Sequence, residues 1–450
     1  MSFKPYPKYK ESGVEWLGRV PEHWEVCKLQ HLFEIHKRIA GQLGYDVFSI
    51  TQNGIRVKDV ESNEGQQAMD YSTYQLVQEG EFAMNPMDLI TGGVDIAAYT
   101  GVTSPDYRVC SMRRAEDHHK RFFLYLVQNA YRRKLFYPYG QGSSQLGRWR
   151  FPRQQFNAFC FPVPSRLEQA AVATFLDHET AKIDALIAEQ QRLIELLQEK
   201  RQAVISHAVT KGLNPDAPMK DSGIEWLGEV PEHWEVCPLK TVVSRIEQGW
   251  SPQCENRPAE DGEWGVLKVG CVNGERFNPE EQKALPGDVA PLAEYEVAEG
   301  DILLSRGNTR ELVGMAALVP AVRSKLLLSD LLYRVRARPE AASAEFLVHL
   351  LRSRTGRFQI ERSATGTSAS MKKVSQGVLQ NVMVAIPPMA EQSDILLAVN
   401  QSADRLDTLA SEAYSAITLL QERRSALISA AVTGQIDVRG FSATGGSEAA

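Results

Sequence analysis

The chain has 450 residues, of which 43% are hydrophobic and 24% charged, and this composition excludes a wholly disordered or collagen-like protein. Acidic residues outnumber basic ones, 56 to 50, so the chain is not basic throughout. A nucleic-acid binder remains compatible with this balance, because affinity depends on local basic patches rather than on net charge.

The sequence predicts a cytoplasmic protein that does not span a membrane. Residues 1–8 lack the apolar core of a secretory signal. The longest apolar stretch, residues 312–322, is shorter than the roughly 18 to 20 residues that a bilayer requires. The six cysteines include no C-x-x-C pair, which is typical of reduced thiols rather than of a disulfide or zinc framework.

A long internal repeat organises the chain. Residues 11–27 read ESGVEWLGRVPEHWEVC, and residues 221–237 read DSGIEWLGEVPEHWEVC. A second matching pair begins with Glu-Gln at Glu168 and Glu391 and ends with LLQEKRQAVISHAVT and LLQERRSALISAAVT. The segments between them, here called the first module (28–163) and the second module (238–386), match only faintly. We therefore predict a tandem duplication whose constant scaffold carries two modules of different specificity. The alternative is that the modules have merely drifted.

Two long helices are predicted at 164–212 and 387–434. Ser165 and Glu168 form an S-x-x-E capping box before the first helix, and Gly212 and Gly434 end the two helices. The start of the second helix lacks the serine and is marked by a pair of prolines. Apolar residues recur at helical spacing, about three per heptad. These residues are Leu176, Ile183, Leu186, Ile187, Leu193, Ile194, Leu197 and Val204 in the first helix, and Ile395, Val399, Leu406, Leu409, Ile417, Leu420 and Leu427 in the second.

Neither helix can bury its apolar stripe alone, so we expect the two copies to pair as an antiparallel coiled coil with pseudo-two-fold symmetry. This symmetry would put the modules at opposite ends and bring the N-terminal segment, residues 1–27, to the end of the second helix. Residues 213–237, the linker and repeated segment, would dock likewise after the first helix. Residues 435–450 are expected to form a flexible tail. The alternative is that each helix packs on its own module as an ordinary core helix.

The modules are predicted to be mixed α/β, so the fold class of the chain is α/β with long helices. Short β-rich runs occur at residues 47–50, 82–84, 266–269 and 302–304. Each module also has one amphipathic helix candidate, from Phe122 to Leu135 and from Ala344 to Ile360.

Both modules carry a basic run at an equivalent place. Residues 113–153 contain ten basic and two acidic residues, and residues 334–373 contain nine basic and three acidic ones. Such a run is often only a solvated face, but its recurrence in two divergent modules favours a strip that contacts phosphates.

Polar loops beside these strips supply the candidate base readers. Gln and Asn can bond adenine bidentately and Arg can bond guanine, while hydroxyls and backbone amides near Gly suit phosphates. Turn capping is the alternative role for any one of them. The candidates are Gln141, Ser143, Ser144, Gln145, Arg148, Arg150 and Arg153 in the first module, and Arg306, Asn308, Arg310, Thr365, Thr367, Ser368, Lys372 and Lys373 in the second.

No catalytic or metal-binding motif is found. The sequence has no G-x-x-x-x-G-K-[ST] loop, no strand-linked G-x-G-x-x-G and no H-E-x-x-H. His118, His119 and His207 are isolated and are interpreted as surface or packing residues. We assign no catalytic residue, no metal ligand and no cofactor to this chain.

The doubled E-W-L-G and P-E-H-W-E-V segments, together with the Pro-x-x-x-Glu-Gln start of the first helix and its shorter copy at Pro388, resemble the specificity subunit of type I DNA restriction–modification enzymes. The resemblance covers essentially the whole chain. It implies that each module is a target-recognition domain reading one half of a bipartite, asymmetric double-stranded DNA target, and that the coiled coil fixes the spacing of the halves.

The resemblance further implies that this chain is a non-catalytic subunit. Methyltransferase subunits, expected in two copies, and a translocase–nuclease subunit would bind it as a scaffold. S-adenosylmethionine, ATP and Mg²⁺ would be held by those partners. Asn85-Pro86-Met87 stands where the second module has Ser305-Arg306-Gly307, so the two loops are expected to read differently. The alternative function is a coiled-coil interaction scaffold without a nucleic-acid role.

Overall fold

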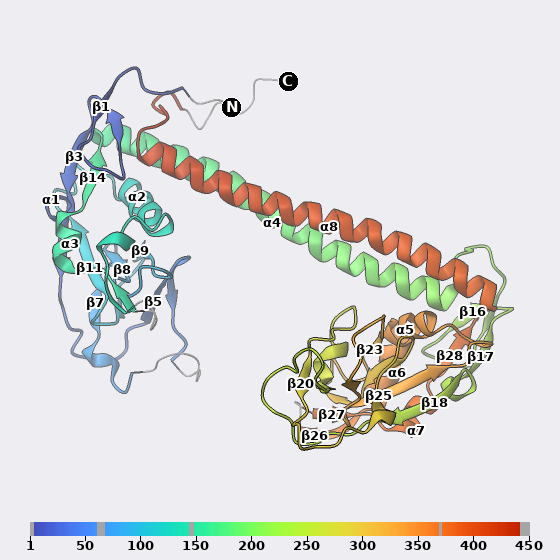
Figure 1. Cartoon of the computed structure of the whole chain (residues 1–450). Coiled ribbons are helices and arrows are strands. Elements are labelled where there is room, and N and C mark those ends of the chain that lie inside the picture. Colours follow the sequence, from blue (N-terminus) through green and yellow to red (C-terminus); the bar gives the residue numbers. More distant parts are fainter. Residues whose placement is uncertain (1–3, 61–67, 144–147, 369–370, 442–450) are drawn as a thin grey trace. The chain divides into compact units, whose positions relative to one another are not determined.

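The computed structural model describes residues 4–60, 68–143, 148–368 and 371–441, which fall into two compact units. Unit 1 contains residues 1–191 and 415–450, and unit 2 contains residues 192–414. Each unit holds one module, one copy of the repeated segment and a part of both long helices (Figure 1). The predicted fold class, mixed α/β with two long helices, is confirmed.

The module of unit 1 is built on two four-stranded sheets. The first, in the order β4-β11-β8-β9, is antiparallel throughout, and the second, β6-β5-β10-β7, pairs β10 with β5 in parallel. Three two-stranded pairs, β1-β2, β3-β14 and β12-β13, complete the unit. The strands are β1 (Tyr9–Glu11), β2 (Arg19–Pro21), β3 (Glu25–Lys28), β4 (Phe33–His36), β5 (Val47–Thr51), β6 (Gly54–Val57), β7 (Gln75–Val77), β8 (Phe82–Met84), β9 (Val94–Ile96), β10 (Gly101–Thr103), β11 (Arg108–Met112), β12 (Gln141–Ser143), β13 (Arg148–Arg150) and β14 (Cys160–Val163).

The module of unit 2 repeats this plan. Its antiparallel sheet has the order β18-β25-β21-β23, and the sheet β20-β19-β24 again contains one parallel pair, β19 with β24. The further strand groups are β15-β16, β17-β28 and β22-β27-β26. The strands are β15 (Met219–Asp221), β16 (Glu229–Pro231), β17 (Glu235–Pro238), β18 (Val243–Gln248), β19 (Gly265–Leu267), β20 (Gln282–Ala284), β21 (Ile302–Ser305), β22 (Gly307–Asn308), β23 (Ala316–Leu318), β24 (Leu326–Leu327), β25 (Leu332–Ala337), β26 (Thr365–Ser368), β27 (Met371–Lys373) and β28 (Met383–Ile386).

The short helices differ between the modules. Unit 1 has α1 (Leu29–Leu32), α2 (Lys120–Arg132) and α3 (Arg153–Ala158), whereas unit 2 has α5 (Ala344–Arg352), α6 (Arg354–Ser363) and α7 (Gln376–Gln380). The single helix expected from Ala344 to Ile360 is therefore wrong. Ser353 breaks it, because its hydroxyl donates to the Leu350 carbonyl at 2.6 Å and accepts from the Gly356 amide at 3.2 Å. Such side-chain bonds compete with the helical backbone and favour a cap.

The long helices are α4 (Arg166–Lys211) and α8 (Met389–Val432), of 46 and 44 residues. The predicted stops are confirmed, since Gly212 and Gly434 both have a positive φ, +78° and +74°. At Gly434 a Cβ would also lie 2.5 Å from the Cδ of Pro21, so a side chain at this position would clash with the repeated segment.

In each unit the two helix parts run antiparallel and share a core with the module. In unit 1, Arg424 of α8 pairs with Asp184 of α4 at 2.8 Å, and Phe175 and Ile428 belong to one apolar core. In unit 2, Arg201 pairs with Asp407 at 3.2 Å. The predicted antiparallel pairing is thus confirmed within each unit. The alternative, in which each long helix packs on a module as a core helix, holds only for the helix ends.

The apolar stripe is narrower than predicted. Ile183, Ile194 and Leu197 are buried, whereas Leu186 and Leu193 are 44% and 41% exposed. Two inward positions per heptad, rather than three, suffice for a helix that faces one partner helix. The outward leucines therefore leave apolar surface on α4.

A carboxylate joins the repeated segment to the start of each long helix, and in unit 1 this carboxylate is buried. In unit 1, Glu168 accepts hydrogen bonds from Trp24 Nε1 at 3.0 Å, His23 Nε2 at 2.9 Å and the Tyr6 hydroxyl at 2.6 Å. Burial and this carboxylate raise the pKa of Tyr6. The predicted capping box is half correct. Ser165 accepts from the Glu168 amide at 3.4 Å, but the Glu168 side chain bonds the repeated segment instead of the cap.

The same junction occurs in unit 2 with one donor fewer. Glu391 accepts from Trp234 Nε1 at 3.1 Å and from His233 Nε2 at 2.7 Å. Asp216 stands at the repeat position of Tyr6, so no tyrosine hydroxyl is available there. Accordingly the Glu391 side chain is 29% exposed, against 4% for Glu168.

The glutamine next to each glutamate anchors the module. Gln169 accepts from the His119 amide at 2.7 Å, just before α2, and Gln392 accepts from the Ser343 amide at 2.9 Å, just before α5. Both amide nitrogens donate to a proline carbonyl five residues earlier, at 2.8 and 2.9 Å. The Glu-Gln pair therefore links helix, repeated segment and module in each unit.

The segment after α8 packs onto the N-terminal segment, as the symmetry predicts. The Asp437 amide donates to the Lys4 carbonyl at 2.9 Å, and the Tyr9 hydroxyl donates to the Gly434 carbonyl at 3.0 Å. Val438 is buried and Phe441 contacts Phe175, so residues 435–441 do not begin the flexible tail that was expected. The remainder of the expected tail, residues 442–450, lies outside the described residues.

All six cysteines are free thiols. Burial raises the pKa of Cys110 and Cys271 to about 12, which keeps both protonated at neutral pH. Within the described ranges, no helix combines the length and the apolar character that crossing a bilayer requires.

Replacing Glu168 by alanine is expected to destabilise unit 1 by about 1–3 kcal/mol, because buried donors lose their acceptor. Glu391→Ala should cost less, since that carboxylate is more exposed and accepts from two donors rather than three. Urea unfolding followed by tryptophan fluorescence measures both. Glu195→Ala, which breaks an exposed pair with Arg192, is the control and should change stability by less than about 1 kcal/mol. Equal losses for all three variants would contradict the expectation.

Candidate nucleic-acid interface

In unit 2 the structure brings the candidate readers of two separate loops into one small sheet. Strand β27 pairs with β26 and also with β22, so that Asn308 lies opposite Lys372. Thr365 and Gly307 both lie opposite Lys373. The loop that contains Arg306 and the 365–373 hairpin are therefore parts of a single surface, here called the unit 2 platform (β22, β26 and β27).

The polar side chains on the unit 2 platform are partly fixed by local bonds. Asn308 donates through Nδ2 to Asn273 Oδ1 at 2.8 Å and accepts from the Thr309 amide at 2.9 Å. Lys372 Nζ donates to the Gly366 carbonyl at 2.6 Å, whereas Lys373 is exposed. Lys373 is thus the cation of this platform most open to a phosphate.

Arg306 and Arg310 lie at the edge of the unit 2 platform. Arg306 Nη1 reaches the Asp330 carbonyl at 3.3 Å, which holds the guanidinium near the strand. Arg310 is exposed. Both therefore remain candidate readers.

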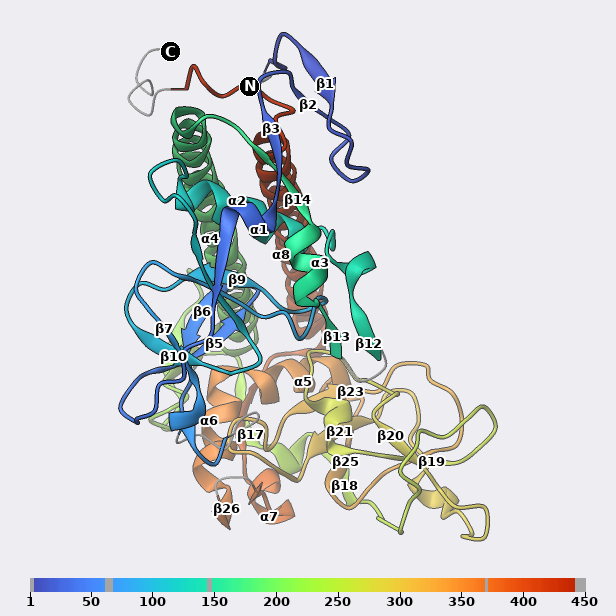
Figure 2. The ribbon, with the colours of Figure 1, turned by 90° about the vertical axis from the view of Figure 1, so that its left-hand side faces the viewer.

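In unit 1 the equivalent hairpin is β12-β13, whose strands lie next to each other below α3 in Figure 2. Gln141 lies opposite Arg150 in its register. Gln141, Arg150 and Arg153, three of the predicted residues, line one cleft of about 470 Å³ together with Met87. This hairpin is called the unit 1 platform below.

Several candidates fall on parts that the structure does not describe. Ser144 and Gln145 lie outside the described residues. The side chains of Ser143, Arg148, Thr367 and Ser368 are likewise not described, so only their backbone pairing is known. For these six residues, DNA contact stays a prediction from the sequence.

The two platforms are attached to their modules by equivalent backbone bonds. The Phe151 amide donates to the Pro86 carbonyl at 2.7 Å, and the Val374 amide donates to the Arg306 carbonyl at 2.9 Å. Asn85-Pro86-Met87 and Ser305-Arg306-Gly307, which the sequence aligns, therefore occupy the same place. Side chains can differ there without loss of the backbone attachment.

Arg108 is a residue at the unit 1 platform that the sequence analysis missed. It opposes Met84 in the sheet, as Tyr333 opposes Leu304 in unit 2, so the two residues are equivalent. Arg108 donates to the Phe151 carbonyl at 2.9 Å, and Tyr333 donates to the Val374 carbonyl at 3.3 Å. Only the pairing of strands far apart in the sequence reveals this equivalence.

The environment of Arg108 is unusual for a charged group. Its guanidinium lies over the Phe156 ring at 4.4 Å, it is 7% exposed, and its Nη1 has no hydrogen-bond partner. Burial lowers the pKa of Arg108. It also lines the 470 Å³ cleft of the unit 1 platform. A buried cation without a carboxylate costs stability, which is typical of functional positions.

Part of the basic run does not belong to the predicted phosphate-contacting strip. Arg334 is 2% exposed and pairs with Glu247 at 2.8 Å, so it supports the sheet. Arg352 donates to the Gly274 and Ala316 carbonyls, and Arg357 donates to the Glu311 carbonyl and pairs with Glu361. Long cationic side chains also serve as structural donors, a role that a charge count cannot separate from phosphate contact.

The interpretation of His118 and His119 as packing residues agrees with their burial, which lowers the pKa of both imidazoles. Across the described portion of the chain, no three His, Cys, Asp or Glu side chains are grouped so that they could hold a metal ion.

Comparison with known proteins places the fold and the repeats in one class. No model of a known protein family matches the chain. Curated relatives do match. The chain is 30% identical over 225 residues, half of its length and 38% of the relative's, to the EcoEI type I restriction enzyme specificity subunit of Escherichia coli. It is 23% identical over 454 residues, 96% of this chain and 97% of the relative, to the MjaVIII specificity subunit of Methanocaldococcus jannaschii.

Solved structures agree in fold. One chain, from a study of the complex assembly and conformational transition of a type I restriction–modification system, superposes with a TM-score of 0.62 at 15% identity and covers 93% of this chain and 99% of its own length. The HsdS subunit from Thermoanaerobacter tengcongensis gives a TM-score of 0.51 at 14% identity, covering 95% of this chain and 100% of its own length.

The resemblance inferred from the sequence is thereby confirmed. The fold, two duplicated α/β modules on long helices, is that of type I specificity subunits. By sequence, this chain is a relative of the specificity subunits of type I restriction enzymes. The matches to the first Escherichia coli relatives span 38% and 58% of those proteins.

Arg108→Met is expected to leave the free energy of unfolding within about 1 kcal/mol of the parent or to raise it, because an apolar side chain replaces a buried cation that lacks a carboxylate. Tyr333→Phe is the matched variant in unit 2, and losing its hydroxyl bond should cost about 1 kcal/mol. Denaturant unfolding measures both. A loss above about 3 kcal/mol for Arg108→Met would show that the ring and carbonyl contacts outweigh the cost of burying the charge.

Proposed function

We propose that this chain is the non-catalytic DNA sequence-specificity subunit of a type I restriction–modification complex. The observation that carries the proposal is the pair of platforms, held at equivalent places by equivalent backbone bonds but presenting different polar side chains. Two such surfaces suit a bipartite, asymmetric target, because each can read a different half.

The chemistry of the platforms supports contact with double-stranded DNA. Lys373 and Arg150 are exposed cations on a strand end, where they can bond phosphates and position the module. Gln141 beside Arg150, and Asn308 beside Lys372, place an amide next to a cation. An amide can bond an adenine edge bidentately, and arginine can bond guanine. Asn308 would use the donor and acceptor capacity that its two internal bonds leave.

The proposal assigns the first target-recognition domain to residues 28–163 and the second to 238–386. The helical segments 164–212 and 387–434 would form the conserved coiled coil, with residues 1–27 and 213–237 as the repeated segments that lock onto it. The Glu168 and Glu391 junctions support this division, because each ties a repeated segment to a helix start.

The proposal also includes the partners. Methyltransferase subunits, two of them, and a translocase–nuclease subunit would assemble on this scaffold in the cytoplasm. S-adenosylmethionine, ATP and Mg²⁺ would be used by those subunits. The outward leucines of α4, Leu186 and Leu193, offer apolar surface for such assembly.

Charge reversal on the platforms tests the DNA contact. Arg150→Glu and Lys373→Glu are made separately in the complex with the methyltransferase subunit. Each should weaken binding of DNA that carries the target site. Each should also reduce the slope of log K against log salt concentration by about one unit per lost phosphate contact. Fluorescence anisotropy over a range of salt concentrations measures both quantities. The target is first defined by methylation-sensitive sequencing of the host genome.

The control for charge reversal is Lys182→Glu, which makes the same charge change at an exposed position on α4. It should leave the salt slope unchanged. If all three variants bind DNA as the parent does while the methyltransferase still assembles, the DNA contact proposed for Arg150 and Lys373 is wrong, and the alternative of a coiled-coil scaffold is favoured.

Removing one heptad from each long helix, residues 187–193 and 415–421, shortens each helix by about 10 Å. If helix length sets the spacing of the two half-targets, the spacer should shorten by about three base pairs. Selection of bound sequences from a library with variable spacers measures this. An unchanged spacer preference in a folded variant would show that the helices do not set the distance.

A further inference from the structure

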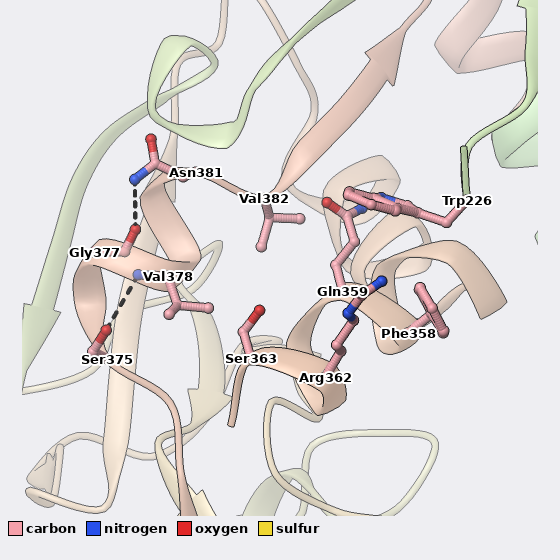
Figure 3. A pocket seen from close by; sticks show the side chains of 10 residues that line it. All are labelled: Trp226, Phe358, Gln359, Arg362, Ser363, Ser375, Gly377, Val378, Asn381 and Val382. Carbon is pink, nitrogen blue, oxygen red and sulfur yellow. Dashed lines mark hydrogen bonds between the residues drawn. The ribbon is translucent and has the colours of Figure 1, made fainter. Parts of the chain in front are cut away.

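A pocket of about 630 Å³ opens beside the repeated segment of unit 2 (Figure 3). Trp226, from the repeated segment, lies on one side with residues of α6, and α7 lies on the other. Trp226 and Phe358 are 39% and 45% exposed, and their ring centroids are 6.2 Å apart. The lining residues are Trp226, Phe358, Gln359, Arg362, Ser363, Ser375, Gly377, Val378, Asn381 and Val382.

In unit 1 the equivalent space is filled by the chain itself. Trp16 is the repeat counterpart of Trp226, and Phe159 stacks on it with centroids 5.6 Å apart and an angle of 16°. Phe159 accepts from the Leu29 amide at 2.8 Å as Val382 accepts from the Leu239 amide at 2.8 Å, so Phe159 and Val382 are equivalent.

A second ring is replaced in the same way. Phe161 lies opposite Cys27 in one strand pair, and Val384 lies opposite Cys237 in the other. The Phe161 ring contacts Trp16 at 6.2 Å. The two phenylalanines beside the first tryptophan are therefore replaced by valines at the equivalent positions of unit 2, and Trp226 is 39% exposed.

We infer that the Trp226 pocket binds an aromatic side chain of a protein partner, with a carboxylate beside it. This inference deepens the proposed function, on which it rests, by locating one partner contact. Unit 1 shows which group fits, since a phenylalanine ring already stacks on the equivalent tryptophan there.

The charge at the pocket explains the carboxylate. Arg362 lies 5.9 Å from the centre of the Trp226 ring, and its side chain points toward the pocket in Figure 3. Among the described residues, no carboxylate forms an ion pair with it. A partner's acidic group could therefore pair with Arg362 while the neighbouring ring stacks on Trp226.

The position of the tryptophan favours a protein over a nucleobase. Trp226 belongs to residues 221–237, which are nearly identical in both copies, whereas sequence readers must differ between modules. Because Phe159 closes the equivalent place in unit 1, the partner would engage this chain once.

The test labels the chain with 5-fluorotryptophan and follows the ¹⁹F resonance of Trp226, assigned with Trp226→Phe. Spectra are recorded for the chain alone, with a DNA duplex carrying the target, with the methyltransferase subunit, and with the methyltransferase and translocase–nuclease subunits together. We expect the Trp226 resonance to shift when a protein subunit is added, and the Trp16 resonance to stay. A shift with DNA alone, or no shift in the full complex, would overturn the inference.

Two variants measure the energetic share of the contact. Val382→Phe supplies the ring that unit 1 carries, and Trp226→Ala removes the platform. Each should weaken binding of the subunit that shifts the resonance at least about tenfold, as expected for a central aromatic contact. Val57→Phe, at an exposed valine of unit 1, is the matched control and should bind as the parent does.

Parent affinity in the Trp226→Ala variant, with the fold intact by circular dichroism, would overturn the inference. The proposed function fails separately, if the parent chain with its methyltransferase binds no specific DNA.

Discussion

The structure depends on a carboxylate at the first turn of each long helix. Glu168 and Glu391 accept from the tryptophan and the histidine of a P-E-H-W segment, while the adjacent glutamine bonds the backbone before the module's helix. A negative charge is also favourable at a helix N-terminus, which adds to the stability of this junction. Two neighbouring residues thus fix how a module is attached to its helix. This explains why the Glu-Gln pair and the P-E-H-W segment occur in both copies.

This attachment leaves the modules free to vary. The platforms are held through backbone amides and carbonyls, Phe151 to Pro86 and Val374 to Arg306, so these bonds do not depend on which side chains occupy the positions. Trp149 of β13 adds a side-chain anchor, because its indole donates to the Tyr137 carbonyl at 2.8 Å. Sheet order is preserved in the same manner, because strand pairing uses only the backbone. The proposed reading of two different half-targets follows from this separation between a constant attachment and variable side chains.

The sequence predicts what is local or repeated and misses what strand pairing decides. Helix lengths, the glycine stops and the docking of the two ends follow from periodicity and symmetry. The Glu168 contact with Trp24 does not, because a capping box and a tertiary contact use the same residue type. Arg334 and Arg108 show the same difficulty. One is a structural cation and the other a buried one at a platform, and only the partners across the sheet distinguish them.

The two units differ in the contacts of their repeated segments, and in both differences unit 2 has the fewer contacts. Unit 1 has a third donor, Tyr6, on its buried glutamate and a phenylalanine stacked on its tryptophan. In unit 2, Asp216 takes the place of Tyr6, and Phe358 lies tilted against Trp226 at 6.2 Å rather than stacked on it. Duplicated halves that only drifted would lose contacts at random positions. Here both losses concern the repeated segment of unit 2, and both leave polar or aromatic groups more exposed, Glu391 at 29% and Trp226 at 39%. A tryptophan exposed in this way is typical of a contact surface, so the asymmetry agrees with the partner contact proposed for unit 2.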